Sequence, residues 1–317
     1  MTLFKHDNTF LSQQAKDLGF IRDTYEKVVR LTDVLEFLNN NPLLKKSLAL
    51  KGGTAINFTI FDLPRLSVDI DLDYLISNSR EEMLEQRQMI NVAIDRFMVS
   101  QGYQKNSRSK NPHSLDSWIY DYTGVSGNKD NIKIEINYSL RAHIFHPEER
   151  LIIPENIGSK EKIKILNPLE IYGSKINALL SRAAARDLYD TKNMISHCLF
   201  NPVEEELLRK CVVFYMAISS QRINKKFSVE AIHSINQRKI KTELYPVIKN
   251  SDKFNLLTTK EMVVEYILNL MELSKDENKF LDQFEHGNYV PELLFEDEKI
   301  IDRIKGHPMA LWKTKSY

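Results

Sequence analysis

The stretch Ser67–Tyr74 constrains the fold most, because apolar and polar side chains alternate along it without a break. One face would carry Val68, Ile70, Leu72 and Tyr74, and the other Ser67, Asp69, Asp71 and Asp73. A period of two residues is that of a β-strand. Aspartate is a poor strand former, and three carboxylates on one face repel one another. The pattern therefore favours a strand whose acidic face holds a hard cation.

Asp69 and Asp71 are the central pair of this acidic face. With a rise of about 3.3 Å per residue, their backbones lie about 7 Å apart, so both carboxylates can converge on one or two Mg²⁺ ions. A solvent-facing edge strand with a chance repetition of aspartates is the alternative that the stretch alone leaves open.

A Gly-Gly-Thr sequence, Gly52 to Thr54, follows the apolar run Ser47–Leu50. Two glycines between an apolar run and a second apolar segment predict a strand-to-helix turn, whose exposed backbone N–H groups can bind phosphate oxygens. Thr54 would either cap the helix or donate a hydrogen bond to a phosphate directly.

These residues carry a family resemblance. Gly52-Gly53-Thr54, a short helix and then Arg65-x-Ser67-x-Asp69-x-Asp71-Leu72-Asp73 resemble motif I of the DNA polymerase β-like nucleotidyltransferase superfamily. More closely they resemble the AbiEii/AbiGii (MenT-like) group of bacterial toxins and abortive-infection proteins. A second block, Lys175–Arg182 followed by Arg186-Asp187-x-x-Asp190, resembles the group's second conserved block.

The resemblance implies an α+β fold with a nucleotidyltransferase-type mixed sheet flanked by helices and followed by a mainly α-helical C-terminal lobe. We expect a catalytic domain over residues 1–166 and a helical domain over residues 167–317 that contributes nucleotide-contacting residues. A chain of 317 residues is long enough for two such lobes.

The segment Ile132–Tyr138 alternates like a second strand, with Ile132, Ile134 and Ile136 on one face and Glu135 on the other. The resemblance implies that this strand adds a third carboxylate, so the expected metal ligands are Asp69, Asp71 and Glu135. Glu135 would complete the metal site or act as a general base. A plain exposed glutamate on an amphipathic strand is the alternative.

By resemblance, Lys175 contacts the nucleotide, and Asp187 or Asp190 is the late acidic residue of the catalytic set. A lysine ammonium is a compact charge suited to the β- and γ-phosphates. Asp187 and Asp190 lie three residues apart, hence on one helix face, where a structural salt-bridge network is an equally good interpretation. The expected nucleotide-binding residues are Gly52, Gly53, Thr54, Arg65, Ser67, Lys175 and Arg182. Ser67 is also a candidate for self-modification.

Further helices are predicted from periodicity and end signals. They cover Ile21–Leu38, Arg80–Gln101, Leu169–Arg182, Val203–Ser219, Ser228–His233, Glu243–Ile248, Lys260–Leu273, Asp276–Phe284 and Pro291–Phe295.

The charge balance gives no general argument for a polyanionic partner, since 44 Lys and Arg face 43 Asp and Glu. Any such site must be a local patch. One basic loop carries Lys105, Arg108 and Lys110; phosphate contact and ordinary solvated charge both remain open for it. No uncharged run approaches the roughly 18 residues of a membrane span, so we expect a cytoplasmic protein without a membrane partner.

The expected reaction is Mg²⁺-dependent transfer of a nucleoside monophosphate from an NTP to an acceptor hydroxyl, with release of pyrophosphate. The resemblance implies a toxin of a toxin–antitoxin or abortive-infection system, with tRNA 3′ ends as one acceptor type and a cognate antitoxin as a partner. Two alternatives remain at this point: transfer to a protein or small molecule, and a non-catalytic nucleotide-binding or interaction module.

Overall fold

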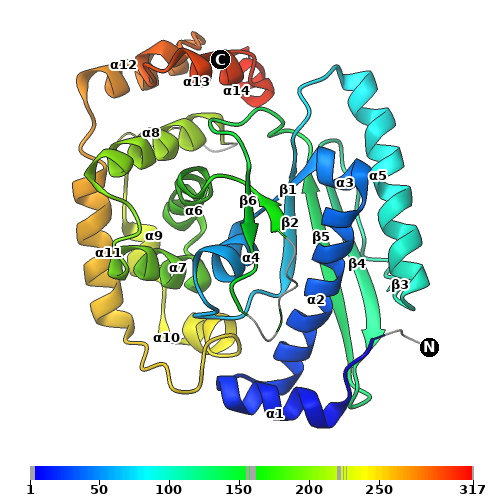
Figure 1. Cartoon of the computed structure of the whole chain (residues 1–317). Coiled ribbons are helices and arrows are strands. Elements are labelled where there is room, and N and C mark those ends of the chain that lie inside the picture. The colour runs from blue at the N-terminus through cyan, green and yellow to red at the C-terminus, as the bar shows by residue number, and fades with distance from the viewer. Residues whose placement is uncertain are drawn as a thin grey trace. The chain divides into compact units, whose positions relative to one another are not determined.

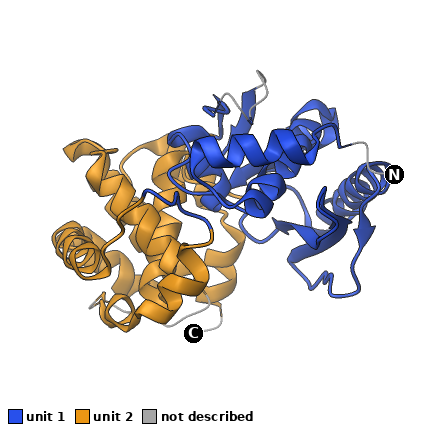
Figure 2. Cartoon of the chain, turned by 90° about the horizontal axis from the view of Figure 1, so that it is seen from below, with its two compact units in different colours: residues 1–141, 147–166, 247–251 blue, residues 142–146, 167–246, 252–317 orange. Residues whose placement is uncertain are grey.

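The computed structural model describes residues 4–154, 157, 162–219, 223, 225 and 227–315. The chain forms two compact units, coloured separately in Figure 2. Unit 1 comprises Met1–Arg141, Pro147–Leu166 and Val247–Ser251, and unit 2 comprises Ala142–His146, Asn167–Pro246 and Asp252–Tyr317. The expected division between residues 166 and 167 is one of the points where the chain passes from one unit to the other. Two short segments depart from that division: residues 142–146 belong to unit 2, and residues 247–251 belong to unit 1.

Unit 1 is built on a mixed sheet with the strand order β3-β4-β5-β2-β1-β7-β6. The strands are β1 (Leu48–Lys51), β2 (Asp69–Tyr74), β3 (Gln104–Lys105), β4 (Leu115–Thr123), β5 (Lys129–Asn137), β6 (Glu148–Leu151) and β7 (Lys162–Ile165). Strand β2 runs antiparallel to β1 and parallel to β5. The predicted α+β fold with a mixed sheet is confirmed.

Helices cover one face of this sheet in the β4–β5 region. Unit 1 contains α1 (Asn8–Leu18), α2 (Arg22–Asn40), α3 (Pro42–Ser47), α4 (Gly52–Ala55), the π-helical turn η1 (Ile56–Ile60) and α5 (Arg80–Ser100). Trp118 of β4 donates to Asn91 of α5, and Lys27 of α2 pairs with Asp130 of β5. Figure 1 shows α2 and α5 alongside β4 and β5. The even-numbered residues of these two strands therefore face the helices.

The predicted helix Arg80–Gln101 is confirmed, with α5 ending at Ser100. Ser79 begins it with a capping box, since its side chain accepts from the Glu82 N–H while Glu82 accepts from the Ser79 N–H. Gly102 follows the helix with φ +80°, as expected of a residue that ends a helix in the left-handed region.

Unit 2 is helical throughout its described elements. They are α6 (Pro168–Arg182), α7 (Ala185–Ser196), α8 (Pro202–Ile218), α9 (Glu230–Ser234), α10 (Gln237–Lys239), the π-helical turn η2 (Ile240–Leu244), α11 (Leu256–Leu270), α12 (Lys275–Glu285), the 3₁₀ turn η3 (Pro291–Leu293), α13 (Glu298–Ile304) and α14 (Pro308–Thr314). No helix in the described part of either unit is long and apolar enough to cross a bilayer.

The predicted helix Glu243–Ile248 is wrong, because the helical turn ends at Leu244. Pro246 has no backbone N–H and cannot continue a helix. Beyond it the chain turns and pairs with the loop before β2: the Val247 carbonyl accepts from the Leu66 N–H at 2.7 Å, and Ile248 forms a bridge with Arg65. The segment 247–251 therefore supports the loop that leads into β2.

Candidate active site

Asp71 lies in a polar row that crosses four strands of unit 1. Strand register places Lys51 of β1 beside Asp71, Asp71 beside Glu135 of β5, and Glu135 beside Ser117 of β4. Residues directly paired on neighbouring strands share a sheet face, and the strands lie about 4.8 Å apart. Asp69, two residues earlier on the same face of β2, is paired with Lys133 of β5. Sequence alternation predicted the acidic face, and the register brings Glu135 to it.

Burial and neighbouring charges in this row both act on the acidity of Asp71. The pKa of its carboxyl is raised to about 6, chiefly by burial; the negative charges of Asp69 and Glu135 add to the shift, while Lys51 and Lys133 oppose it. The surroundings of Asp71 on this sheet face therefore disfavour the charged form of its carboxyl.

Two lysines that the sequence analysis missed accompany the carboxylates. The Lys51 ammonium lies 2.5 Å from the buried Asp73 carboxylate, and the Lys133 ammonium lies 2.9 Å from that of Glu135. Lys133 stands two residues before Glu135, so the same alternation that predicted Glu135 could have placed it on this face. Lys51 directly precedes the two glycines. Asp73 therefore serves as the counter-ion of Lys51.

The two glycines allow the turn after β1 to pack directly against the acidic strand. Gly52 has φ +68°, and a Cβ atom there would lie 2.6 Å from Oδ2 of Asp71. A Cβ atom on Gly53 would lie 2.6 Å from Nη2 of Arg65 and 2.9 Å from Oγ of Ser67. Any larger residue would displace groups of the expected site, so the close approach explains why glycine stands at both positions.

Thr54 is not the N-cap of α4, which was one of its two expected roles, because Lys51 holds that position. The Thr54 hydroxyl donates to the Asp69 carbonyl, and its oxygen lies 2.9 Å from the Ser67 hydroxyl oxygen. Thr54 and Arg65 are buried, and the Arg65 guanidinium donates to the Leu66 carbonyl. These residues hold the turn and the start of β2 together.

Asn57, which the sequence analysis also missed, holds the Gly52–Gly53 turn by a side-chain hydrogen bond. Its side-chain amide is fully buried and donates to the Gly53 carbonyl at 2.8 Å. This hydrogen bond ties the turn to the helical segment that follows it.

The donor set of this row suits a divalent metal ion. Asp69, Asp71 and Glu135 supply carboxylate oxygens, which Mg²⁺ prefers, and the charges of Asp69 and Glu135 contribute to the raised pKa of Asp71 after burial. Among the described residues, no three His, Cys, Asp or Glu side chains are already gathered around one point as a metal site. The metal assignment of these three residues stays a prediction, which their chemistry fits.

The second predicted block forms an ion-pair cluster within unit 2. The Lys175 ammonium of α6 lies 2.9 Å from the Asp187 carboxylate and 2.8 Å from the Asp190 carboxylate, both on α7. All three side chains are buried, whereas Arg182, which pairs with Asp187 at 2.9 Å, is 66% exposed. Burial alone would raise the pKa of Asp187, but Lys175 and Arg182 hold it below its usual value. The cluster ties the end of α6 to the start of α7.

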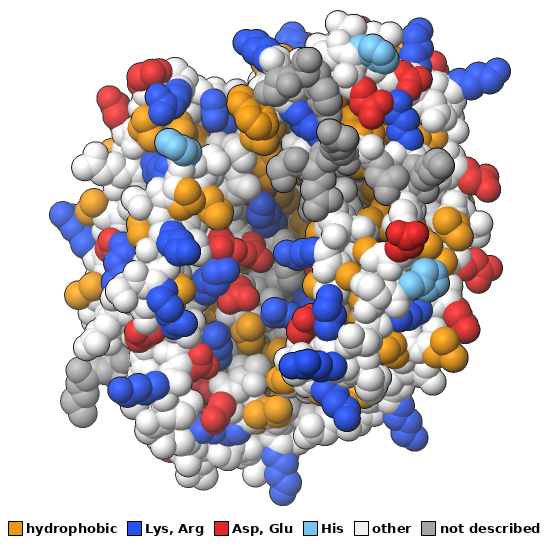
Figure 3. All heavy atoms as spheres, turned by 180° about the vertical axis from the view of Figure 1, so that it is seen from behind, with side chains coloured by type: hydrophobic (Ala, Val, Ile, Leu, Met, Phe, Trp, Pro, Cys, Tyr) orange, Lys and Arg blue, Asp and Glu red, His pale blue; other side chains and the backbone are white. Residues whose placement is uncertain are grey.

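Basic and acidic side chains are interspersed over the face of the protein shown in Figure 3. This agrees with the balanced composition, so an anionic partner must be recognised by local groups.

A mixed sheet with paired carboxylates beside a Gly-Gly turn is the arrangement of a nucleotidyltransferase. A family model described as "Nucleotidyl transferase AbiEii toxin, Type IV TA system" matches residues 36–285. The chain belongs to this family. The resemblance predicted from the two sequence blocks is confirmed.

One solved structure shows the same fold over almost the whole chain. It is MenT4, a nucleotidyltransferase toxin from Mycobacterium tuberculosis H37Rv, with a TM-score of 0.65 and 16% sequence identity. The alignment covers 97% of this chain and 99% of MenT4. No curated protein matches the sequence.

Proposed function

We propose that this nucleotidyltransferase acts in the cytoplasm as a Mg²⁺-dependent toxin, which moves a nucleoside monophosphate from an NTP to a hydroxyl of RNA, the tRNA 3′ end being the expected acceptor. One observation carries the proposal: strand register aligns Asp71 with Glu135, two residues from Asp69, directly against the backbone of the Gly52–Gly53 turn. Carboxylates and a phosphate-binding turn are the two parts that nucleotidyl transfer needs. A cognate antitoxin is the proposed protein partner.

In this proposal, Asp69, Asp71 and Glu135 hold Mg²⁺, which when bound offsets the negative charge of the phosphates. The N–H groups of the Gly52–Gly53 turn orient the phosphate oxygens. The acceptor oxygen attacks the α-phosphorus, a new O–P bond forms, and the bond from that phosphorus to the bridging oxygen breaks, so that pyrophosphate leaves. Glu135 accepts the proton of the attacking hydroxyl.

The remaining predicted residues take supporting roles in the proposal. Ser67 and Arg65, whose side chains lie against Gly53, position the phosphates together with Thr54. For unit 2 we retain the predicted contact of Lys175 and Arg182 with the nucleotide, with Asp187 and Asp190 as positioning residues for that lysine. The Lys175 ion pairs support a positioned cation but also account for its burial without a ligand.

The test is a transfer assay with purified full-length protein, Mg²⁺, each α-³²P-labelled NTP in turn and total tRNA. Wild type is compared with the double variant Asp69→Asn/Asp71→Asn. Asp17→Asn, which removes an exposed carboxylate from α1, is the matched control. Label in tRNA that is lost in the double variant and survives Asp17→Asn is expected, and it would also identify the NTP.

Absence of label in RNA from an NTP-binding wild type would refute the RNA acceptor. Label in a protein or a small molecule would then redirect the acceptor assignment, whereas no label in any fraction would favour a non-catalytic nucleotide-binding module.

A further inference from the structure

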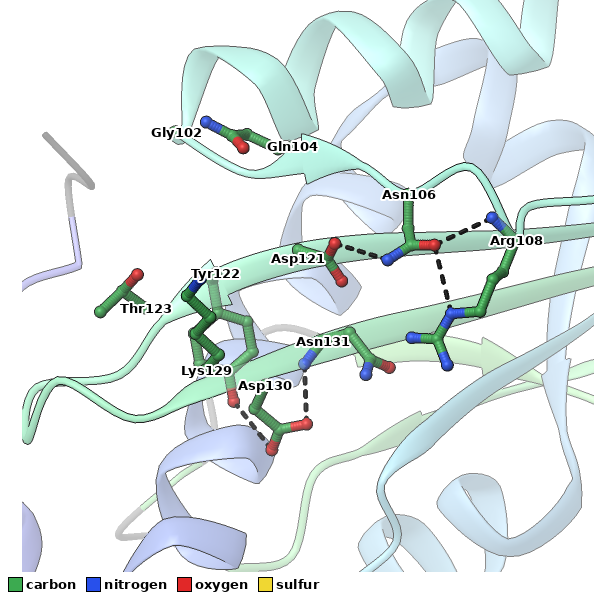
Figure 4. Close-up of a pocket in the computed structure, with 10 residues that line it drawn as sticks. All are labelled: Gly102, Gln104, Asn106, Arg108, Asp121, Tyr122, Thr123, Lys129, Asp130 and Asn131. Carbon is green, nitrogen blue, oxygen red and sulfur yellow. Dashed lines mark hydrogen bonds between the residues drawn. The ribbon is translucent and has the colours of Figure 1, made fainter.

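A polar hollow of about 390 Å³ lies on unit 1 at the β3–β4–β5 end of the sheet, and neither the proposed metal ligands nor the Gly52–Gly53 turn lines it. We call it the β3–β5 pocket. The residues that matter here are Asn106, Arg108, Asp121, Lys129 and Asn131, drawn in Figure 4. Its volume is that of a pocket for a nucleotide-sized group.

Of the pocket residues on β4 and β5, Asp121, Thr123, Lys129 and Asn131 lie on the sheet face that carries the proposed metal ligands, while Tyr122 and Asp130 lie on the other face. Register pairs Ser117 with Glu135 and Asp121 with Asn131 on β4 and β5. All four residues are odd-numbered and so point away from α2 and α5, whose contacts are with even-numbered residues of these strands. Asn131 precedes Glu135 by four residues, which is about 13 Å along the strand.

Strand order places the pocket and the phosphate-binding turn on opposite sides of the β2 carboxylates. The turn follows β1 on one flank of β2, and the pocket lies on β4 and β5 on the other flank. When a nucleotide is bound at the turn, the β4–β5 side of this face therefore stays open to a second substrate.

The two acids of the pocket, Asp121 and Asp130, are both engaged by neighbouring groups. The Asp121 carboxylate accepts from the Asn106 amide at 2.6 Å, and Asn106 Oδ1 in turn accepts from the backbone N–H and the Nε–H of Arg108. Figure 4 shows this chain of hydrogen bonds, in which Arg108 uses its backbone N–H and its Nε–H. The pocket's other acid, Asp130, is paired with Lys27.

Arg108 and Lys129 are the pocket's two cations, and both are exposed. In the described part of the chain neither has an acidic partner within 4.0 Å. Arginine binds phosphate oxygens through its planar N–H groups, and lysine does so as a point charge. The Asn131 amide beside them offers a donor and an acceptor.

We propose that the β3–β5 pocket binds the phosphodiester backbone of the acceptor RNA, upstream of the hydroxyl that is presented to Glu135. This inference rests on the proposed function. Arg108 and Lys129 contact phosphates, and the Asn131 amide contacts a sugar or a base edge. Single-stranded RNA ends, whose backbone and base edges are accessible, are the form that proteins recognise most readily. Arg108 and Lys129 are thus positioning residues for the acceptor.

The test compares Arg108→Gln/Lys129→Gln with Arg96→Gln/Lys46→Gln in the full-length protein. The control pair removes the same charge from exposed positions on α5 and α3. Binding of a fluorescent single-stranded RNA oligonucleotide is measured by anisotropy from low to high salt without NTP, and transfer to total tRNA is measured separately.

The pocket variant should bind the RNA about tenfold more weakly at low salt, as the loss of charge-assisted hydrogen bonds implies. The slope of log affinity against log salt should fall by about 1.4, which is about 0.7 for each lost phosphate contact to a single strand. Its KM for tRNA should rise while its KM for NTP stays at the wild-type value, and Arg108→Lys/Lys129→Arg should restore binding.

Equal RNA affinity and salt slope in the pocket and control variants would overturn the inference, as would a wild type that does not bind RNA. If the pocket variant binds RNA more weakly but the wild type labels no RNA, the pocket is upheld and the proposed transfer to RNA fails. If the pocket variant loses transfer only to a protein acceptor, the pocket belongs to a protein partner and the inference is refuted.

Discussion

Replacing Asp71 by asparagine should stabilise the protein while abolishing transfer. The pKa of Asp71 is raised from its ordinary value of 3.8 to about 6, chiefly by burial and then by Asp69 and Glu135 against the attraction of Lys51. Each unit of pKa corresponds to about 1.4 kcal/mol, so holding this carboxylate ionised in the folded state costs about 3 kcal/mol at pH 7. Asparagine has a similar shape and no charge, and it relieves most of that cost.

The pH dependence follows from the direction of the shift. Below its ordinary value of 3.8, Asp71 is protonated in both the folded and unfolded states and has no effect on stability. Between that value and about 6, the folded state binds more protons, so the contribution of Asp71 to stability falls as the pH rises. The advantage of Asp71→Asn should therefore be full above about pH 6 and vanish towards pH 4.

The assay is urea unfolding of the metal-free protein at pH 7 and pH 4, with Asp73→Asn as the matched control on the same strand face. Asp73 is the buried partner of Lys51, so its replacement should destabilise the protein, by about 1–3 kcal/mol. A stability of Asp71→Asn equal to or below that of wild type at pH 7 would refute the reasoning that burial and like charges make the ionised Asp71 costly.

Two further substitutions and one pH profile test the packing around both clusters. Gly52→Ala should cost about 1–3 kcal/mol more than Gly127→Ala in urea unfolding and should abolish transfer, because both glycines have positive φ but only Gly52 would bring a Cβ against Asp71; equal costs would contradict this. Lys175→Met should lower stability by about 3–5 kcal/mol, since buried carboxylates lose their cation, and an unchanged unfolding midpoint would count against it. Lys175 and Arg182 lower the pKa of Asp187, so the Asp187 carboxylate should stabilise the protein fully above pH 3.8 and lose this contribution on further acidification. Urea unfolding should show that pH dependence in wild type and not in Asp187→Asn.

The sequence predicted the elements of unit 1 that carry the candidate site, because its signals there are local; α1, α3, β3, β6 and β7 were not predicted. Alternation predicted β2 and β5, and the spacing of apolar residues predicted α5. Periodicity could not reveal that segment 247–251 returns to pair with Arg65, since that pairing depends on residues about 180 positions apart. Pro246 was the one local signal against a helix there.

For the candidate site, residue types were predictable but their partners were not. The motif placed Asp69, Asp71 and Asp73 on one face, yet only the register shows Asp71 beside Glu135 and only the side-chain contacts show Asp73 bound to Lys51. The close packing of Gly52 on Asp71 is equally a tertiary feature. A spacing rule specifies which residues can meet, and strand pairing decides which of them do.

The central claim is that the carboxylates of β2 and β5 perform nucleotidyl transfer, and single-turnover release of pyrophosphate measures it most directly. Wild type, Asp69→Asn and Glu135→Gln are each mixed with Mg²⁺, NTP and total tRNA, and pyrophosphate is compared with labelled product. We predict equal amounts of both from wild type and background amounts from the two variants. Pyrophosphate release by Asp69→Asn at the wild-type rate would contradict the account.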